Sequence, residues 1–421
     1  ADVVVADYHY YYDTSAMLYA LTQAHQWKVG VLVDEAHNLV ERARSMYTAQ
    51  LSQCSLAAAR KASDGTVKKS LDRLQRPWSS LNKEQAPSYQ AYEQVPGGLL
   101  LAVQRAVGAI SDALAHAPML PGDPLLAFYW EALQFMALAE QLGPHALFDV
   151  SLVQQQIGRS RMPVSNLCIR NVIPAPHLAA RHAAAHTTVM FSGTLSPQHF
   201  YRDMLGLPES AGWLDVHGPF HAEQLAVEVV RHISTRYRDR EASLRPIADV
   251  VSKQYAKQPG NYLCFLSSFE YLERVADCLQ AHHPQIPVWR QTRAMGEATR
   301  SAFLESFSDS GEGIGFAVLG GMFSEGVDLP GKRLIGAFVA TLGLPQVNPI
   351  NEQMKTAMDQ HFGKAKGYDY TYLYPGLRKV VQAAGRVIRA EDDRGSVFLI
   401  DDRFRRKEVQ ALLPNWWRLS S

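Results

Sequence analysis

The stretch Val31-Leu32-Val33-Asp34-Glu35-Ala36-His37 places two adjacent acids directly after an apolar run that is rich in β-branched residues. Such a run is typical of a buried strand in a parallel sheet. Because open α/β sheets bind ligands beyond the carboxyl ends of their strands, we expect the two acids at a ligand-binding edge. Taken alone, the Asp-Glu pair could equally cap the helix that follows.

Two carboxylates at such an edge suit phosphoryl transfer. This chemistry needs one carboxylate to hold Mg²⁺, directly or through water, and a second group to orient or deprotonate the attacking water. Asp34 suits the first role and Glu35 the second. We therefore predict a nucleotide site at this edge, with Mg²⁺ bound near both acids.

The segments around this stretch alternate between strand and helix patterns. Residues 3–5 and 29–33 indicate strands, and a helix is predicted over 14–24. From about Leu51 to about Arg161 strand patterns nearly vanish and helical periodicity recurs. The predicted helices of this region cover 56–74, 99–116 and 124–142. We predict a helical insertion of roughly a hundred residues, which is large enough for a separate subdomain.

The alternation of strands and helices then resumes. Runs at 167–172 and 187–191 suit central strands of the first domain, which the insertion therefore splits. Further strands are predicted at 261–266, 286–289, 314–319, 333–340 and 396–400, with helices at 269–282 and 298–306. The predicted fold class is α/β, with two parallel-sheet domains. Their expected bounds are 1–50 and 162–204 for the first domain, 51–161 for the insertion and 205–421 for the second domain.

The amino-acid composition excludes few classes of protein. With 42 basic and 41 acidic residues among 421, bulk charge does not indicate nucleic acid. The four cysteines form no C-x-x-C pair, so neither a zinc site nor a disulfide framework is indicated. No uninterrupted apolar run reaches the roughly 18 to 20 residues that span a bilayer. We expect a cytoplasmic, monomeric protein without a membrane partner.

A second motif, Gln382-Ala383-Ala384-Gly385-Arg386-Val387-Ile388-Arg389, carries two arginines three residues apart. We predict both on one helix face, with Gln382 one turn before Arg386. Such arginines can neutralise charge that develops on a transferring phosphate. Alone, an R-x-x-R pattern is usually a solvated helix face. Together with the acidic strand end of the first α/β unit, it indicates a nucleotide bound in a cleft between the two domains.

Hydroxyl residues follow another predicted strand at Ser192-Gly193-Thr194. They could bond to a neighbouring carboxylate or to His37 and so couple the nucleotide to the next element. Ser196-Pro197 also fits an ordinary N-cap followed by proline at the first helical position. Both interpretations can hold, with Thr194 linking and Ser196 capping.

Two further strand ends carry candidate residues. In the stretch 324–330, Gly326 lets a backbone approach phosphate or sugar closely, and Asp328 could accept from a ribose or orient Arg386. By itself this stretch is a turn motif. Ser267 and Ser268 follow the strand at 261–266, where a helix N-terminus suits a nucleic-acid phosphate. An N-cap role for Ser268 fits equally well.

Three weaker nucleic-acid candidates remain. Tyr8 and Tyr10 could stack on bases, although tyrosines near a strand end more often belong to the core or its rim. Arg403 opens a basic run that could follow a DNA backbone. A solvated helix face explains that run at least as well.

Taken in order, these motifs resemble the XPD/Rad3 and DinG branch of superfamily 2 helicases over nearly the whole chain. Residues 34–38 match motif II of that family, 192–197 motif III, 266–271 motif IV, 324–330 motif V and 382–389 motif VI. Residues 1–10 are similar to the stretch that follows the family's iron–sulfur domain. The helical insertion is similar to its Arch domain.

The resemblance implies two RecA-like domains and an ATP-driven motor that moves 5′ to 3′ on single-stranded DNA. Such a motor opens duplexes in repair or replication and acts on single-stranded and forked DNA. Asp34 and Glu35 would bind Mg²⁺ and activate water. The implied nucleotide-binding residues are His37, Gln382, Gly385, Arg386 and Arg389. The implied coupling residues are Ser192, Gly193, Thr194, Gly326 and Asp328.

One part of the family pattern is missing. The sequence holds no G-x-x-x-x-G-K-[ST] loop, and the family places that loop and its four iron–sulfur cysteines before the region that this chain matches. Any iron–sulfur cluster would then be held by cysteines outside this chain. Without the loop a triphosphate loses its backbone cradle and its lysine, so we expect this chain alone to hydrolyse ATP poorly.

Two alternatives stay open. One is a helicase-like nucleic-acid-binding or regulatory module without catalysis. The other is an RNA helicase of the D-E-A-H type, which the insertion between motifs II and III disfavours.

Overall fold

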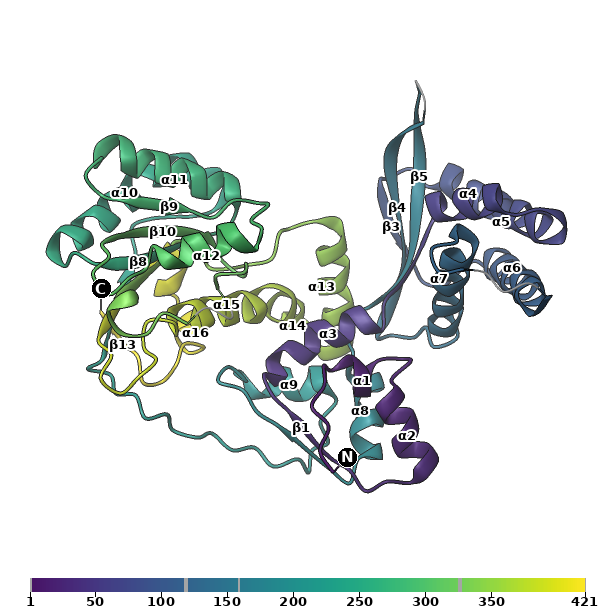
Figure 1. Ribbon diagram of the computed structural model, residues 1–421, viewed down its shortest axis with the longest axis horizontal. Helices are drawn as coiled ribbons and strands as arrows, with labels where there is room; N and C mark the ends of the chain where they lie inside the picture. Colours follow the sequence, from purple (N-terminus) through teal and green to yellow (C-terminus); the bar gives the residue numbers. More distant parts are fainter. Residues whose placement is uncertain (1, 117–119, 158–159, 325–327, 421) are drawn as a thin grey trace. The chain divides into compact units, whose positions relative to one another are not determined.

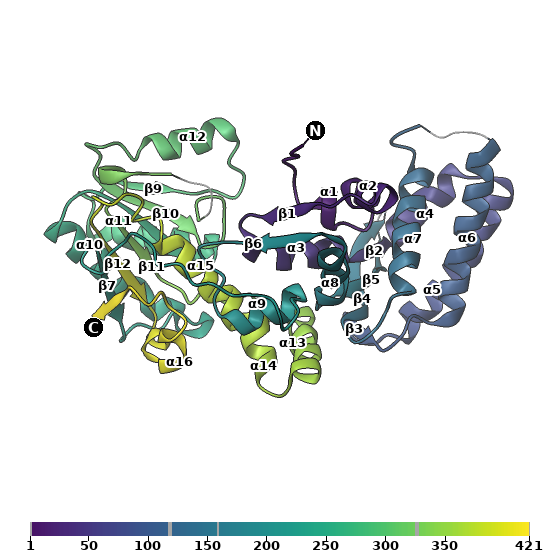
Figure 2. The same ribbon diagram turned by 90° about the horizontal axis from the view of Figure 1, so that it is seen from below.

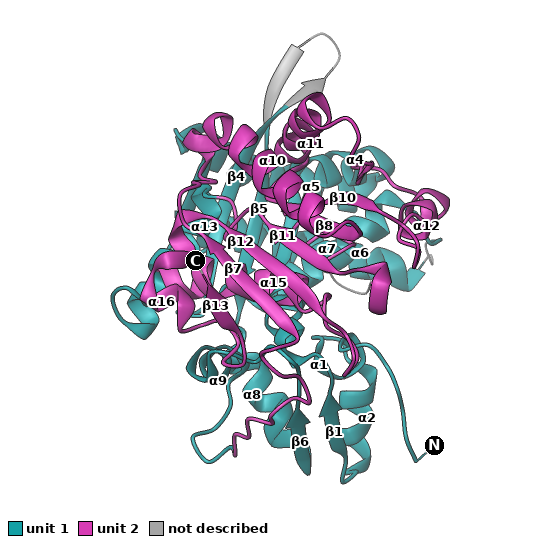
Figure 3. Ribbon diagram, turned by 90° about the vertical axis from the view of Figure 1, so that its left-hand side faces the viewer, with its two compact units in different colours: residues 1–211, 347–367 teal, residues 212–346, 368–421 magenta. Residues whose placement is uncertain are grey.

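The computed structural model describes residues 2–116, 120–157, 160–324 and 328–420 (Figure 1). The chain divides into two compact units, coloured separately in Figure 3. Unit 1 comprises residues 1–211 and 347–367, and unit 2 comprises residues 212–346 and 368–421. The division after residue 211 lies close to the predicted domain boundary, whereas the inclusion of 347–367 in unit 1 differs from the prediction.

The α/β part of unit 1 is built on strands β1 (Gly30–Val33) and β6 (Thr187–Met190), which pair in parallel. Its helices are α1 (His9–Tyr12), α2 (Met17–His25), the 3-10 turn η1 (Ala36–Asn38), α3 (Leu39–Met46), α8 (Ala175–Ala184) and α9 (Gln198–Leu205). The strand predicted at residues 3–5 is wrong. Val3 and Val5 are 79% and 95% exposed, because no described strand lies beside them to accept the hydrogen bonds of a sheet.

The insertion contains an antiparallel sheet as well as helices. Its strands are β2 (Ala49–Ser52), β3 (Tyr89–Tyr92), β4 (Ala146–Ile157) and β5 (Ser160–Asn171), in the order β2-β5-β4-β3. Helices α4 (Gln53–Ala62), α5 (Gly65–Glu84), α6 (Gly97–His116) and α7 (Pro124–Ala139) lie on one side of this sheet (Figure 2).

The prediction that residues 167–172 form a central strand of the first domain's parallel sheet is wrong. These residues fall largely within β5, which pairs with β4 and β2, and not within the parallel sheet. Strand β4 was not predicted because its apolar residues Phe148 and Val150 alternate with polar ones such as Asp149, which is buried in an ion pair with Arg170. An alternating strand of this kind lacks the continuous apolar run on which the prediction relied.

Helix α13 (Pro349–Phe362) follows unit 2 strands in sequence but contacts β3 of the insertion, and it buries Ala357 and Met358. This contact explains why residues 347–367 group with unit 1. Among the described residues, α6 alone has the length and apolar composition of a membrane-crossing helix, and here it packs against α5 and α7.

Unit 2 is a doubly wound parallel sheet in the strand order β13-β7-β12-β11-β8-β10-β9. The strands are β7 (Leu225–Val230), β8 (Asn261–Leu266), β9 (Val288–Arg290), β10 (Gly313–Val318), β11 (Gly336–Val339), β12 (Gly395–Ile400) and β13 (Arg418–Ser420). The helices are α10 (Arg240–Lys257), α11 (Phe269–His282), α12 (Glu297–Glu305), α15 (Tyr374–Ala384) and α16 (Lys407–Gln410), and the short α14 (Lys366–Tyr368) spans the boundary between the two units. Shorter helical turns are η2 (Tyr237–Asp239), η3 (Gly331–Arg333), the π-helical η4 (Asp369–Leu373) and η5 (Asp402–Arg405).

Two hydrophobic cores lie on opposite faces of this sheet. Along β8, Leu263 and Phe265 face the core that α12 and α15 cover, whereas Tyr262 and Cys264 face the core under α10 and α11. All residues of β8 are buried, as expected for a central parallel strand. The predicted α/β fold class with parallel sheets is confirmed, whereas the insertion predicted as helical also contains a four-stranded antiparallel sheet.

Candidate functional site

The acidic pair stands on a sharp turn at the end of β1. The carbonyl of Val33 accepts from the backbone N–H of Phe191, and the N–H of Ala36 donates to the carbonyl of Phe191, both at 3.1 Å. Between these bonds Glu35 adopts a left-handed conformation with φ of 45°. A non-glycine residue enters that region at a cost of roughly 1–2 kcal/mol, so the surrounding bonds must hold it there. The turn leaves Asp34 and Glu35 exposed at the sheet edge.

A hydrogen-bonded network holds the Glu35 carboxylate. The hydroxyl of Ser192 donates to Glu35 Oε2 at 2.9 Å and lies 2.6 Å from Nδ1 of His37. The same His37 nitrogen is 3.2 Å from Glu35 Oε2. The His37 side chain is buried, whereas that of Glu35 is 59% exposed. One carboxylate oxygen is therefore held by the protein while the group as a whole remains accessible.

Ser192, and not Thr194, makes the hydrogen bonds to the Glu35 carboxylate and to His37. The backbone N–H of Thr194 donates to the Ser192 hydroxyl at 3.2 Å, and Thr194 Oγ1 has no hydrogen-bond partner among the described residues. Ser196 does not cap α9, because that helix starts at Gln198 with Pro197 in the N-cap position. Gly193 has open space where a Cβ would lie.

Tyr8 contacts the backbone of the acidic turn. Its hydroxyl donates to the carbonyl oxygens of Asp34 at 2.5 Å and Glu35 at 3.0 Å. Burial, together with the negative charges of Asp34 and Glu35, raises the pKa of Tyr8. This hydroxyl contact was not predicted from the sequence, which left stacking of Tyr8 and Tyr10 on bases and a place in the core or its rim as alternatives. Tyr10 is 51% exposed, and its stacking stays a prediction.

The arginines of the second motif lie beyond their helix and not on its face. Helix α15 ends at Ala384, and Gly385 follows as its C-cap. The carboxylate of Asp393 accepts from the backbone N–H of Arg389 at 2.6 Å and of Ala390 at 2.7 Å. These bonds hold the chain in a turn at the point where the helical pattern predicted continuation.

Each arginine contacts the 324–330 segment. Arg386 Nε donates to the carbonyl of Ser324 at 3.2 Å, and Arg389 Nε lies 3.8 Å from Asp328 Oδ1. The Asp328 side chain is 76% exposed, so the ion pair is weak. Gln382 lies in the last turn of α15, before Gly385. Gly326 falls outside the described residues.

The two serines after β8 have different roles. Ser268 is the N-cap of α11, and its hydroxyl accepts from the backbone N–H of Tyr271 at 3.3 Å. The hydroxyl of Ser267 accepts from Nη2 of Arg240 at 2.8 Å. The sequence did not single out Arg240, since an arginine at the start of a helix usually belongs to a solvated face.

Arg403 is engaged within the protein. Its Nε and Nη2 donate to both oxygens of Asp401, at 2.7 and 2.9 Å, and its side chain is 13% exposed. Burial raises the pKa of Asp401, but the bonds from Arg403 outweigh this effect and hold the pKa below its usual range. The structure thus uses Arg403 to neutralise a buried acid, which corrects the interpretation of Arg403 as a free contact for DNA.

The residues suit Mg²⁺ held jointly with a nucleotide. Mg²⁺ is usually bound by one or two carboxylates together with substrate phosphates, which Asp34 and Glu35 can complement. Within the described part of the chain, no group of three or more His, Cys, Asp or Glu side chains is placed to hold a metal ion. Cys168 and Cys264 are buried free thiols in different units.

Comparison with known proteins supports a helicase. The family described as "Helicase C-terminal domain" matches residues 251–420. The chain is 26% identical over 196 residues to the ATP-dependent DNA helicase chl1 of Schizosaccharomyces pombe, a match that covers 42% of this chain and 23% of that protein. It thus matches only about a quarter of that relative's length.

Solved structures share the fold over nearly the whole chain. A structure titled XPD_APO has a TM-score of 0.61 at 17% identity and covers 98% of this chain and 80% of that one. The structure of S. tokodaii Xpd4 has a TM-score of 0.58 at 16% identity, covering 93% of this chain and 75% of that one.

Proposed function

We propose that this chain is an XPD/Rad3-like helicase of superfamily 2 and forms motor parts of an ATP-dependent DNA helicase; its likeness to the helicase C-terminal family, to chl1 and to XPD_APO supports the proposal. The motor would move 5′ to 3′ on single-stranded DNA and open forked duplexes during DNA repair or replication. Its single-stranded track would be gripped through the backbone and through base stacking, without sequence readout.

The observation that carries this proposal is the Ser192 hydroxyl between Glu35 and His37. A purely structural acid at a strand end needs no such support, because water satisfies an exposed carboxylate. Here the hydroxyl and the buried imidazole orient a carboxylate that stays accessible. Such an orientation is what a group that positions an attacking water requires.

The roles of the other residues follow from their chemistry. Asp34 would hold Mg²⁺, and the bound ion would supply positive charge to the phosphates of the nucleotide. Glu35 would orient the attacking water and accept its proton. Arg386 and Arg389 would neutralise charge on the transferred phosphate, with Asp328 restraining Arg389.

The test compares Glu35→Gln with wild type in the whole protein. Glu140→Gln, which changes an exposed acid at the C-cap of α7, serves as a matched control. Glu35→Gln should lower DNA-stimulated ATP hydrolysis about 10²- to 10⁴-fold, the contribution typical of general acid–base catalysis. Binding of single-stranded DNA should persist in both variants. Equal ATPase activity in Glu35→Gln and wild type would contradict the proposal.

Two results would favour the alternatives. A wild-type protein that binds DNA without hydrolysing ATP would be a helicase-like binding module. Unwinding of RNA duplexes in preference to DNA duplexes would indicate an RNA helicase.

A further inference from the structure

We infer that Tyr237 is a stacking platform for one base of single-stranded DNA and that Arg240 holds it in place. The inference deepens the proposed function and rests on it, because it assigns part of the DNA track to named side chains of unit 2. Neither residue belongs to a motif singled out in the sequence.

Tyr237 lies at the carboxyl edge of the parallel sheet. It begins the turn η2, a few residues after β7 ends at Val230. The segment between them is anchored to the end of β12, since Thr235 donates to the buried Asp401 through its backbone N–H at 3.0 Å. Ser267 stands at the end of β8, at the same edge. Ligands of open α/β sheets bind at this edge.

Arg240 contacts both Tyr237 and Ser267. Its guanidinium carbon lies 5.1 Å from the ring centre of Tyr237 and 5.0 Å from that of Tyr271, within the range of cation–π attraction. Its Nη2 donates to Ser267. Tyr271 is buried and its hydroxyl bonds with that of Ser243, so one side of this arrangement belongs to the core. Arg240 thereby ties Tyr237 to a rigid support.

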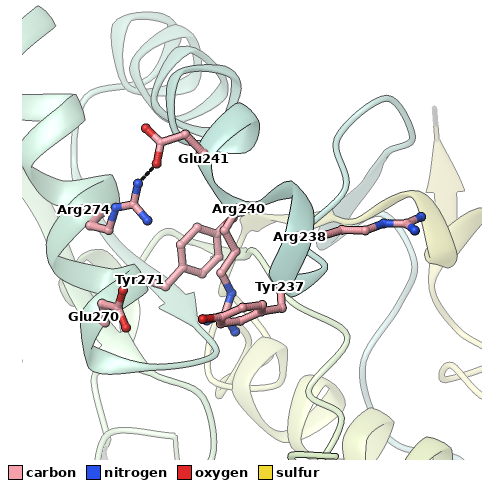
Figure 4. A pocket seen from close by; sticks show the side chains of 7 residues that line it. All are labelled: Tyr237, Arg238, Arg240, Glu241, Glu270, Tyr271 and Arg274. Carbon is pink, nitrogen blue, oxygen red and sulfur yellow. Dashed lines mark ion pairs between the residues drawn. The ribbon is translucent and has the colours of Figure 1, made fainter.

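Tyr237 itself contributes little to that core, because it is 83% exposed. It forms one wall of a pocket of about 170 Å³, shown in Figure 4. The pocket is lined by Tyr237, Arg238, Arg240, Glu241, Glu270, Tyr271 and Arg274. An exposed aromatic ring that an arginine holds in position offers a π face with little further loss of side-chain entropy on binding.

One arginine beside the pocket stays open to a phosphate. Arg274 forms an ion pair with Glu241, and Arg238 lies 3.5 Å from the carboxylate of Asp239, so the pocket carries no excess positive charge. The Arg238 side chain is nevertheless 83% exposed and can take a further anion. A base on Tyr237 would bring its phosphate toward Arg238. Because every base has a π face, such a site accepts any sequence, as a translocating motor requires.

The test measures binding of a fluorescein-labelled 20-mer of dT to the purified 421-residue chain by anisotropy. Tyr237→Ala should weaken binding about 5- to 150-fold, the range that corresponds to base–aromatic stacking. Tyr237→Phe keeps the ring and should bind as wild type does. Trp27→Ala, which removes another half-exposed aromatic residue in unit 1, is the matched control and should leave affinity unchanged.

A second measurement separates stacking from a merely structural role. Abasic strands retain the phosphates but lack bases, so wild type should bind them more weakly than dT, whereas Tyr237→Ala should bind both equally. The salt dependence of affinity should be the same in Tyr237→Ala and wild type, because no phosphate contact is lost. Arg240→Met should weaken binding, and the double variant should be no weaker than Tyr237→Ala, as expected of a residue that acts through Tyr237.

The failures are distinguishable. If wild type binds DNA and folded Tyr237→Ala binds it equally well, the inference is overturned while the proposed function stands. If Arg240→Met adds its full effect to Tyr237→Ala, the positioning role of Arg240 is overturned. If the wild-type chain binds no single-stranded DNA, the inference and the proposed DNA track both fail for this chain.

Discussion

Replacing Asp401 with asparagine should destabilise unit 2 by several kcal/mol. The Asp401 side chain is fully buried at the end of β12. It accepts from the backbone N–H and the hydroxyl of Thr235, and from the backbone N–H, Nε and Nη2 of Arg403. An amide in this position offers one acceptor oxygen, turns its NH₂ toward donors and leaves Arg403 without a counter-ion.

The magnitude follows from the burial of the pair. Because the Arg403 side chain is only 13% exposed, water cannot replace the lost carboxylate. Removing one partner of a buried ion pair costs about 3–5 kcal/mol, and the retained acceptor of asparagine places Asp401→Asn near 3 kcal/mol. Domains are usually stable by about 5–15 kcal/mol, so the loss is large. Asp402→Asn, which affects a partly exposed pair with Arg236, should cost about 1 kcal/mol or less.

The assay is urea unfolding of the purified chain, with hydrogen exchange followed in residues 225–236 and 395–406. Its pH dependence has a defined sign. The folded pKa of Asp401 is lowered, whereas the unfolded value is about 3.9. The stabilisation is therefore present above about pH 4 and is lost as pH falls through the folded pKa. The difference between wild type and Asp401→Asn should shrink in the same window.

Two results would refute this reasoning. One is a free-energy change below about 1 kcal/mol at pH 7, which is the scale of an exposed pair. The other is a difference between Asp401→Asn and wild type that stays constant down to pH 3, since the carboxylate would then contribute nothing through its charge.

Two further predictions concern unit 1. Ser192→Ala should lower kcat for ATP hydrolysis by the whole protein about tenfold with little change in KM. A hydrogen bond to a charged group contributes roughly 1.5–3 kcal/mol, and the exposure of Glu35 favours the lower end of that range. Steady-state ATPase assays check this prediction, and a raised KM with normal kcat would contradict it. Burial lowers the pKa of His177, whose ring stacks on Tyr47, to about 4. Between about pH 6.5 and 4 the unfolded chain therefore takes up a proton at His177 that the folded chain does not. The free energy of unfolding consequently decreases as the pH is lowered from about 6.5 to 4. His177→Phe keeps the stack and should reduce that slope in unfolding measured from pH 7 to 4; an unchanged slope would show that His177 does not cause it.

Much of unit 2 was predictable from local sequence. The predicted bounds of β8 and α11 agree with the structure, because a largely apolar run marks β8 and a serine N-cap marks the start of α11. A hydroxyl from residues 192–194 beside the acidic pair was also foreseen, since parallel strands bring their carboxyl ends to one edge, but Ser192 makes the contact and not Thr194, to which the prediction assigned it.

Other features were not predictable from helix and strand patterns, although some of their contacts join residues close in the chain. The helical spacing of Gln382, Arg386 and Arg389 predicted one helix face, but the Asp393 carboxylate ends that pattern by binding backbone N–H groups. Arg403 looked like a free cation until folding placed the buried Asp401 against it. Helix α13 carries no sequence signal that assigns it to unit 1.

Local sequence patterns predicted the α/β class, many of the strands and several of the helices, because burial of apolar residues and capping act over a few neighbouring positions. Which charged groups are neutralised internally depends on the folded chain, and folding alone brings Tyr237, Arg240 and Ser267 together. Those outcomes depend on desolvation and on contacts between distant segments, neither of which exists until the chain is packed.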